Sequence, residues 1–226
     1  MACPASRAIS NRCRFWMVKT MTWFITWRMK RTTPGIRASA ASRVSAPVVL
    51  TVLLVTAGCT STASRVTTTY YNISGMSGAE LDKEIAAKGP MKGHALASAE
   101  IRLVPVSVEY EKGERSCRFH RARFRVDANV TLPRWRQQIA SRDRELRSAW
   151  NFISTYARKH EQEHIRIAEK YARKAEEDLM AIPPKPDCDR LEAAAERTLK
   201  RNRTAHDREQ NAFDAREQKR LAKLFE

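Results

Sequence analysis

The clearest element of the chain is marked by strict alternation of apolar and polar residues. Between residues 121 and 132, apolar side chains recur at every second position: Ala122, Phe124, Val126, Ala128, Val130 and Leu132. A period of two over this length predicts a β-strand with one buried and one wet face. Arg121, Arg123 and Arg125 share the wet face, which is therefore one candidate contact with an anionic surface.

Weaker patterns predict three further elements before this strand. Residues 66–70 alternate and predict a short strand. Residues 77–80 read Ser-Gly-Ala-Glu, a capping box that predicts a short helix ending at residues 89–90, Gly-Pro. Residues 101–110 favour a strand, in which Pro105 predicts an edge position or a bulge.

The second half of the chain predicts helices. Pro133 stands where a first helical residue would, and nothing from there to Met180 strongly breaks a helix. One straight helix of that length would measure about 70 Å, so we expect it to bend or split in a compact domain. Three prolines between 183 and 186 end the segment, and Asp187 or Asp189 caps a last helix. Strands before helices predict an α+β fold, a small antiparallel sheet followed by long helices.

The amino terminus has the features of an export signal. Residues 46–55 form an apolar run that suits a signal-peptide core and is too short to span a bilayer. Residues 56–59, Thr-Ala-Gly-Cys, resemble the bacterial lipobox, in which the cysteine is lipidated and becomes the first mature residue. We therefore expect residues 1–58 to be a leader and Cys59 to be the lipid site. An ordinary cleaved signal or a membrane anchor is the alternative.

The leader itself divides at Met29. Residues 29–58 have the length of a lipoprotein signal peptide, whereas residues 1–28 add a short tryptophan-rich stretch and indicate an over-extended gene start. Residues 59–226 then form the mature domain. Thr60 follows the lipid site and is not the aspartate that retains lipoproteins at the inner membrane. We expect an exported protein, lipid-anchored on the periplasmic side of the outer membrane if the source is Gram-negative.

Charge adds an expectation about partners. The formal net charge is +17, but nine of the 42 basic residues lie in residues 1–58, which hold no acid. The remainder carries +8, from 33 basic against 25 acidic residues. This excess favours an anionic cell-envelope surface, with ordinary solvated helix faces as the alternative. No aromatic and basic motif indicates a nucleic-acid partner.

The cysteines support export. Of the five, Cys3 and Cys13 lie in the leader and Cys59 is the proposed lipid site. Cys117 and Cys188 remain, and an even pair in an oxidising compartment predicts a disulfide. Neither has a second cysteine at the C-x-x-C spacing of zinc sites, which disfavours a ligand role.

Residues 160–164, His-Glu-Gln-Glu-His, carry the candidate chemistry. On a helix, His160 and His164 lie on one face and can share one tetrahedral metal ion. Glu161 then stands near the water that attacks a peptide carbonyl, as a general base. The pattern predicts a zinc peptidase site, and two histidines on a polar helix face are the alternative.

Several blocks of the mature chain, taken in order, resemble an uncharacterised bacterial family described as predicted secreted zinc-dependent proteases. The blocks are residues 70–75 (Tyr-Tyr-Asn-Ile-Ser-Gly), residues 130–135 (Val-Thr-Leu-Pro-Arg-Trp) and the pentad 160–164. The resemblance implies a zinc ion held by the pentad.

The resemblance also bears on the third ligand. Family members tend to close with Tyr-Asp-x-x-Thr-x-His-Gly, and here Phe213 replaces the tyrosine while Asp214 persists. Lys219 and Arg220 replace the closing histidine and glycine. We expect Asp214 to be the third ligand, with His206 as the alternative, since a catalytic zinc takes three protein ligands and a water.

Three functions remain open from the sequence. The first is an envelope-anchored zinc metallopeptidase acting on peptides or proteins, held at the membrane by its lipid. The second is a catalytically inactive envelope lipoprotein with a structural or scaffolding role. The third is a cell-wall-binding module that uses the basic strand face.

Overall fold

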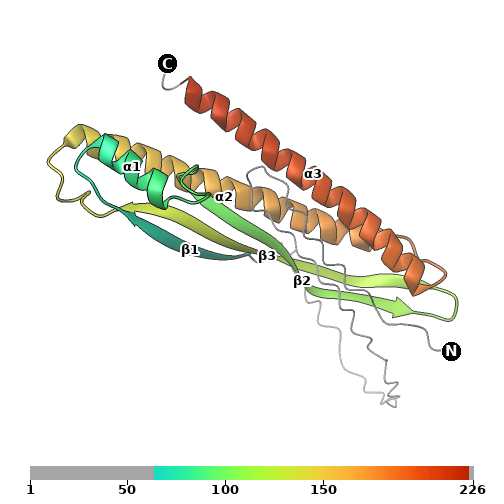
Figure 1. The fold of residues 1–226 in the computed structure, drawn as a ribbon. Coiled ribbons are helices and arrows are strands. Elements are labelled where there is room, and N and C mark those ends of the chain that lie inside the picture. The colour runs from blue at the N-terminus through green and yellow to red at the C-terminus, as the bar shows by residue number, and fades with distance from the viewer. Residues whose placement is uncertain (1–63, 224–226) are drawn as a thin grey trace, which may run out of the picture.

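The computed structural model describes residues 64–223, and the predicted leader and Cys59 lie outside this range. A three-stranded sheet forms one layer, α2 lies along it, and α3 runs obliquely across α2 (Figure 1). The predicted α+β class is confirmed. The elements in chain order are β1 (Ser64–Ile73), α1 (Gly78–Lys88), β2 (Ser98–Lys112), β3 (Cys117–Trp135), α2 (Arg144–Met180) and α3 (Cys188–Ala222).

The sheet has the order β1-β3-β2, with the alternating strand at its centre. The predicted inward face of β3 is confirmed, because Phe124 and Val126 lie in the main core with their alternating neighbours. β2 and β3 pair antiparallel, but β1 and β3 pair parallel, so the sheet is mixed rather than wholly antiparallel. The chain reverses between β1 and β2 and again between β2 and β3, which makes β3 run in the direction of β1.

The capping and edge signals read from the sequence are confirmed. Ser77 accepts a hydrogen bond from the Glu80 amide and begins α1, while the Glu80 carboxylate accepts one from the Met76 amide at 2.6 Å. Pro105 lies on the edge strand β2, and the pairing register shifts between Pro105 and Ser107. A residue without an N–H is tolerated at such a bulge.

The prediction that Pro133 begins a helix is wrong. Pro133 belongs to β3 and pairs with Tyr71 of β1. The pairing of β3 with β2 ends at Thr131, so beyond it β3 has β1 as its only neighbour. Alternate amides there point away from the sheet, which is where a strand accepts proline. The helix begins instead at Arg144, capped by Asp143.

The expected bend or split of the long helix is also wrong, because α2 is one element of 37 residues. At 1.5 Å per residue it is about 55 Å long. The 19 residues of β3 extend over about 63 Å, so the sheet is long enough to support the whole helix. Alanines on α2, among them Ala168, Ala172 and Ala175, are buried in the same core as β3 and let the helix lie close to the sheet.

A disulfide joins Cys117, the first residue of β3, to Cys188, the first residue of α3, as predicted. Lys185 in the preceding turn exchanges both backbone hydrogen bonds with Cys117, at 2.7 and 2.8 Å. Asp187 caps α3 by accepting from the Arg190 amide. The start of α3 is thus fixed to the end of the sheet. Within residues 64–223, no helix combines the length and apolarity needed to cross a membrane.

Candidate metal centre

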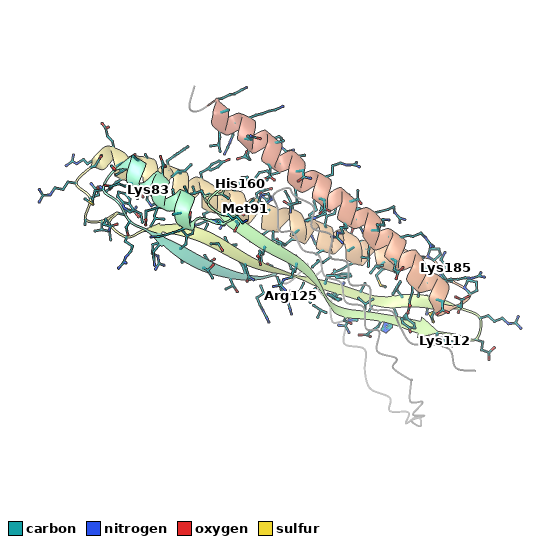
Figure 2. All side chains as sticks on the ribbon, viewed as in Figure 1. Lys83, Met91, Lys112, Arg125, His160 and Lys185 are labelled. Carbon is teal, nitrogen blue, oxygen red and sulfur yellow. A yellow bond between two sulfur atoms is a disulfide. The ribbon has the colours of Figure 1, made fainter. Side chains whose placement is uncertain are left out.

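The two histidines of the pentad lie near the middle of α2, where Figure 2 labels His160. Because they are four residues apart, both rings project from one side of the helix, and their Nε2 atoms are 3.1 Å apart. His164 is buried, whereas His160 retains about a fifth of its side-chain exposure. One imidazole is therefore fixed inside the protein while its neighbour reaches solvent.

Asp214 of α3 completes a group of three potential metal ligands. Its Oδ1 lies 3.2 Å from His160 Nε2 and 3.0 Å from His164 Nε2. Zinc with ligands at 2.0–2.1 Å in a tetrahedron separates neighbouring ligand atoms by about 3.3 Å. The three donor atoms thus approach the spacing of one triangular face of that tetrahedron, and a zinc ion held by them would keep its fourth position for a substrate or water.

Phe213, next to Asp214, packs against both histidines. Its ring centroid lies 4.8 Å from that of His160 and 5.1 Å from that of His164. Tyr156, one turn before His160 on α2, has its ring 6.0 Å from the His160 ring. These contacts restrict rotation of the two imidazoles, and an aromatic wall lowers the local dielectric constant around the donor atoms.

Gln210 of α3 is the hydrogen-bond partner of His164 behind the donor group. Its Oε1 contacts His164 Nδ1, and its Nε2 donates to the backbone oxygen of His164 at 3.0 Å. The same Nε2 lies 3.0 Å from Nε2 of His206. His206 in turn places Nδ1 3.0 Å from a carboxylate oxygen of Asp207.

His206, the alternative third ligand, is not part of the donor group. It lies on α3 and is fully buried, and the Tyr171 ring of α2 meets its ring edge-on at 5.4 Å. Burial lowers the pKa of His206, and the Asp207 carboxylate opposes that effect only in part. His206 lies two turns before Asp214 on the same face of α3, and the Gln210 side chain stands between its ring and that of His164.

Glu161 is buried, with 6 % of its surface exposed. The helical period places it about 100° around α2 from His160, on the side of the buried Ala157 and Ala168, of which Ala168 belongs to the core shared with the sheet. A buried carboxylate keeps its charge only where polar groups or a cation compensate it. This position beside the donor group is compatible with the predicted role as a general base, and that role stays a prediction.

A hollow of about 580 Å³ reaches Tyr156, whose ring lies 6.0 Å from the His160 ring, but none of the three donor residues lines it. It is lined by Asn151, Phe152, Thr155, Tyr156, Lys159 and Arg220. The Tyr156 hydroxyl donates to Glu217 at 2.9 Å, and burial followed by this contact raises the pKa of Tyr156. Arg220 is paired with Glu217 at 2.9 Å. The hollow is therefore lined by the aromatic rings of Phe152 and Tyr156 and by two cationic side chains, Lys159 of α2 and Arg220 of α3.

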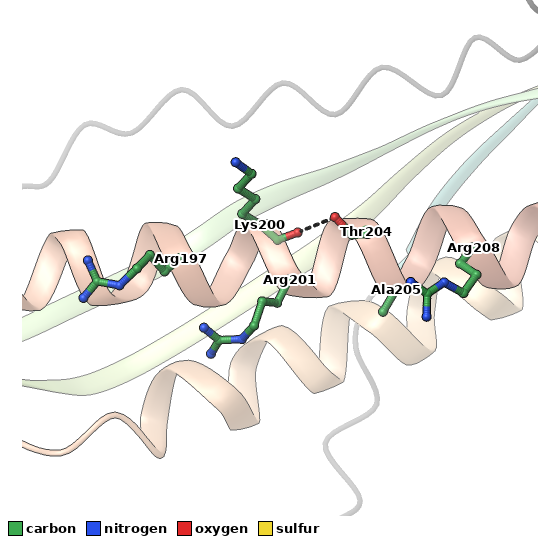
Figure 3. Close-up of a pocket in the computed structure, with 6 residues that line it drawn as sticks. All are labelled: Arg197, Lys200, Arg201, Thr204, Ala205 and Arg208. Carbon is green, nitrogen blue, oxygen red and sulfur yellow. Dashed lines mark hydrogen bonds between the residues drawn. The ribbon is translucent and has the colours of Figure 1, made fainter.

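A second hollow, of about 540 Å³, lies on α3 and includes none of the three donor residues. Figure 3 shows its basic lining side chains, Arg197, Lys200, Arg201 and Arg208. Within residues 64–223 none of these four takes part in an ion pair that the structure records, and the only one with a side-chain hydrogen bond is Arg201, to Thr198.

The arginines of the β3 wet face are placed differently. Arg123 pairs with Glu176 at 3.4 Å, and Arg125 pairs with Asp127 at 2.6 Å. The Arg125 guanidinium holds the pKa of Asp127 below its usual range. The strand row expected to face an anionic surface is thus neutralised in large part by the protein's own carboxylates.

Comparison with models of protein families finds one that matches most of the chain. The model of a bacterial family of unknown function, DUF922, matches residues 68–220. The chain belongs to the DUF922 family. The matched range of this DUF922 protein includes the donor group, the disulfide and Gln210. The predicted membership of an uncharacterised bacterial family is therefore confirmed. No curated protein and no solved structure matches the chain.

The structure thus brings together His160, His164 and Asp214, which the sequence analysis selected, and separates His206 from them. Gln210 and Tyr156 were missed. Both follow a signal that the sequence contains, because Tyr156 precedes His160 by four residues and Gln210 precedes Asp214 by four. Neither residue type attracts notice without knowledge of which helix faces meet.

Proposed function

We propose that this protein is a zinc-dependent peptidase of the bacterial cell envelope. The observation that carries the proposal is the convergence of His160, His164 and Asp214, with donor atoms 3.0–3.2 Å apart and contributed by two helices. Two imidazoles and one carboxylate are a ligand set of catalytic zinc, which keeps one position open. Iron(II) accepts a similar set, but Glu161 beside the first histidine favours hydrolysis over oxygen chemistry.

The residues around the donor group have separable tasks in this proposal. Zinc would supply a Lewis acid that polarises a carbonyl and activates water. Glu161 accepts the proton of the attacking water and returns it to the leaving amine. The Tyr156 ring lines the adjoining hollow, and its hydroxyl is held in place by donating to Glu217. Phe213 shields the imidazoles from bulk water.

Replacing Glu161 with glutamine should abolish peptide hydrolysis and leave zinc binding unchanged. The amide has nearly the same shape but cannot accept a proton, and general base catalysis contributes roughly 10²–10⁴-fold to rate. The measurement pairs hydrolysis of a casein or mixed-peptide substrate with the zinc content of the same sample. Glu163→Gln is the matched control, since Glu163 is held by Arg166 on the same helix. Wild-type hydrolysis by the Glu161→Gln variant would exclude this mechanism.

The envelope location rests on the amino-terminal sequence. We propose that Cys59 carries the lipid, because small residues and a short apolar run precede it. The Cys59→Ser form should move from the membrane to the soluble fraction, as a single residue carries the anchor. Unchanged membrane association of that form would refute the anchor.

A second candidate function is binding to an anionic membrane surface through α3. The specific observation is the group Arg197, Lys200, Arg201 and Arg208, for which the described residues show no ion pair, whereas Arg123 and Arg125 of β3 pair with carboxylates. The nearby acids Asp207 and Glu209 contact His206 and Lys170 instead. A lipid on Cys59 would keep Ser64, the first residue of β1, within about 17 Å of the bilayer, since the tether between them spans only five residues.

Reversing Arg197, Arg201 and Arg208 to glutamate in the Cys59→Ser form should weaken binding to vesicles of anionic phospholipid by about a hundredfold or more. The reason is the loss of three cations, each contributing about 1 kcal/mol near such a surface. Reversal of Arg121, Arg123 and Arg125 is the control with the same net charge. Equal loss in both variants in a vesicle sedimentation assay would assign the effect to net charge and exclude α3 as the binding face.

A further inference from the structure

The contact between Gln210 and the backbone of His164 determines which end of the Gln210 amide points where. A backbone carbonyl oxygen only accepts hydrogen bonds, so the amide atom 3.0 Å from the His164 oxygen must be the nitrogen. The amide oxygen then faces Nδ1 of the His164 ring. The orientation follows from the main chain and does not depend on any assumption about the histidine.

The orientation of that amide determines the tautomer of His164. Gln210 Oε1 is an acceptor, so the ring nitrogen that it contacts must carry the proton. In neutral imidazole the other nitrogen then carries the lone pair. That nitrogen is Nε2, the atom 3.0 Å from Asp214 and 3.1 Å from His160. A metal ligand needs its lone pair at that position.

His206 acts on the opposite side of the amide. The Gln210 nitrogen has one hydrogen directed to the His164 carbonyl and its second toward Nε2 of His206, so that ring nitrogen must accept. The His206 proton is then on Nδ1, where Asp207 accepts it at 3.0 Å. In this series of hydrogen bonds, which runs from His164 through Gln210 and His206 to Asp207, each donor faces an acceptor. The two central side chains, Gln210 and His206, are at most 1 % exposed.

We infer that Gln210 is a positioning residue that holds His164 in the tautomer whose Nε2 lone pair faces His160 and Asp214, and that His206 supports it from behind. This inference rests on the proposed metal site and adds the residues that prepare it. A ligand held in the correct tautomer before the metal arrives binds without the cost of proton rearrangement. Outer partners of this kind typically change metal affinity by about 10–100-fold when removed.

The tautomer can be observed directly in the zinc-free chain. With histidine labelled by ¹⁵N, long-range correlation spectra at mildly alkaline pH report which ring nitrogen carries the proton, and only five histidines need assignment. We expect His164 to be protonated at Nδ1 in the wild-type protein. A proton on Nε2 of His164 would overturn the inference without any variant.

The Gln210→Leu variant tests whether Gln210 sets the tautomer of His164. It should show mixed tautomers at His164 and bind zinc about 10–100-fold more weakly. Thr198→Val is the matched control, because it also removes a buried polar group from the inner face of α3 but does not touch His164. An unaltered His164 spectrum and unaltered zinc affinity in Gln210→Leu would overturn the inference. If that variant does not fold, as judged by circular dichroism, the wild-type spectrum still decides.

Failure of the metal site and failure of the inference give different results. A wild-type chain that binds no zinc, with His164 protonated at Nδ1, would refute the proposed peptidase and leave the Gln210 contact established. Zinc binding by a wild-type chain whose His164 is protonated at Nε2 before metal addition would support the metal site and overturn the inference about Gln210.

Discussion

Replacing His164 with alanine should abolish zinc binding at neutral pH. His164 is the buried member of the donor group, and its loss leaves His160 and Asp214, of which each keeps more than a fifth of its side-chain surface exposed. Two ligands in partial contact with water rarely hold zinc. The loss in affinity should exceed the roughly 10–100-fold that follows removal of an outer partner. Calorimetric titration of the untagged chain with zinc measures the effect.

His120→Ala is the control for the number of histidines. His120 lies on β3, is half exposed and contacts only Glu109 among the ion pairs that the structure records. Its removal should leave zinc affinity unchanged. Asp214→Asn tests the third ligand, since it keeps the shape of the side chain and removes the charge. Wild-type zinc affinity in both His164→Ala and Asp214→Asn would show that the metal, if bound, lies elsewhere.

Removing the disulfide by the double substitution Cys117→Ala and Cys188→Ala should lower the free energy of unfolding by about 4 kcal/mol. The physical reason is the long loop that the bond closes, with a sequence separation of 71 residues. The bond restricts the unfolded chain over this whole loop. Urea denaturation in the presence of a chelator measures the change without a contribution from metal binding.

Chemical reduction provides the control for this second prediction. A reducing agent should destabilise the wild-type chain by a similar amount and leave the double variant unaffected. Equal stability of the oxidised and reduced wild-type chains would contradict the entropic account, because the core residues around Cys117 are unchanged in that comparison.

The sequence predicted those parts of the fold that follow from local patterns. Alternation at Phe124 and Val126 predicted the buried face of β3, and the cap at Ser77 predicted α1. Pro133 was misassigned because its place in the sheet depends on where β2 stops pairing, which no local pattern reports. The unbroken length of α2 depends on the length of the sheet beneath it, and that is a tertiary property.

The candidate site divides in the same way. His160 and His164 could be paired from their spacing alone, because one helix carries both. Asp214 required the family resemblance, since it lies on α3 and 50 positions beyond His164. Gln210 could not be predicted, because its role exists only where the inner faces of α2 and α3 meet. Residues that act across two helices need the packing before they can be recognised.

The disulfide at the start of α3 has a mechanical consequence for the donor group. Cys188 is a covalent pivot, and Asp214 sits on the same helix about 39 Å farther along its axis. Metal binding at Asp214 would therefore hold the C-terminal part of α3 against α2, while the disulfide already holds its N-terminal end to the sheet. By thermodynamic linkage, a metal that binds only the folded chain would stabilise it, and a change that loosens the packing of α3 on α2 would weaken the affinity for that metal. The disulfide between Cys117 and Cys188 would thus favour metal binding at the proposed site from a distance, by keeping α3 in place.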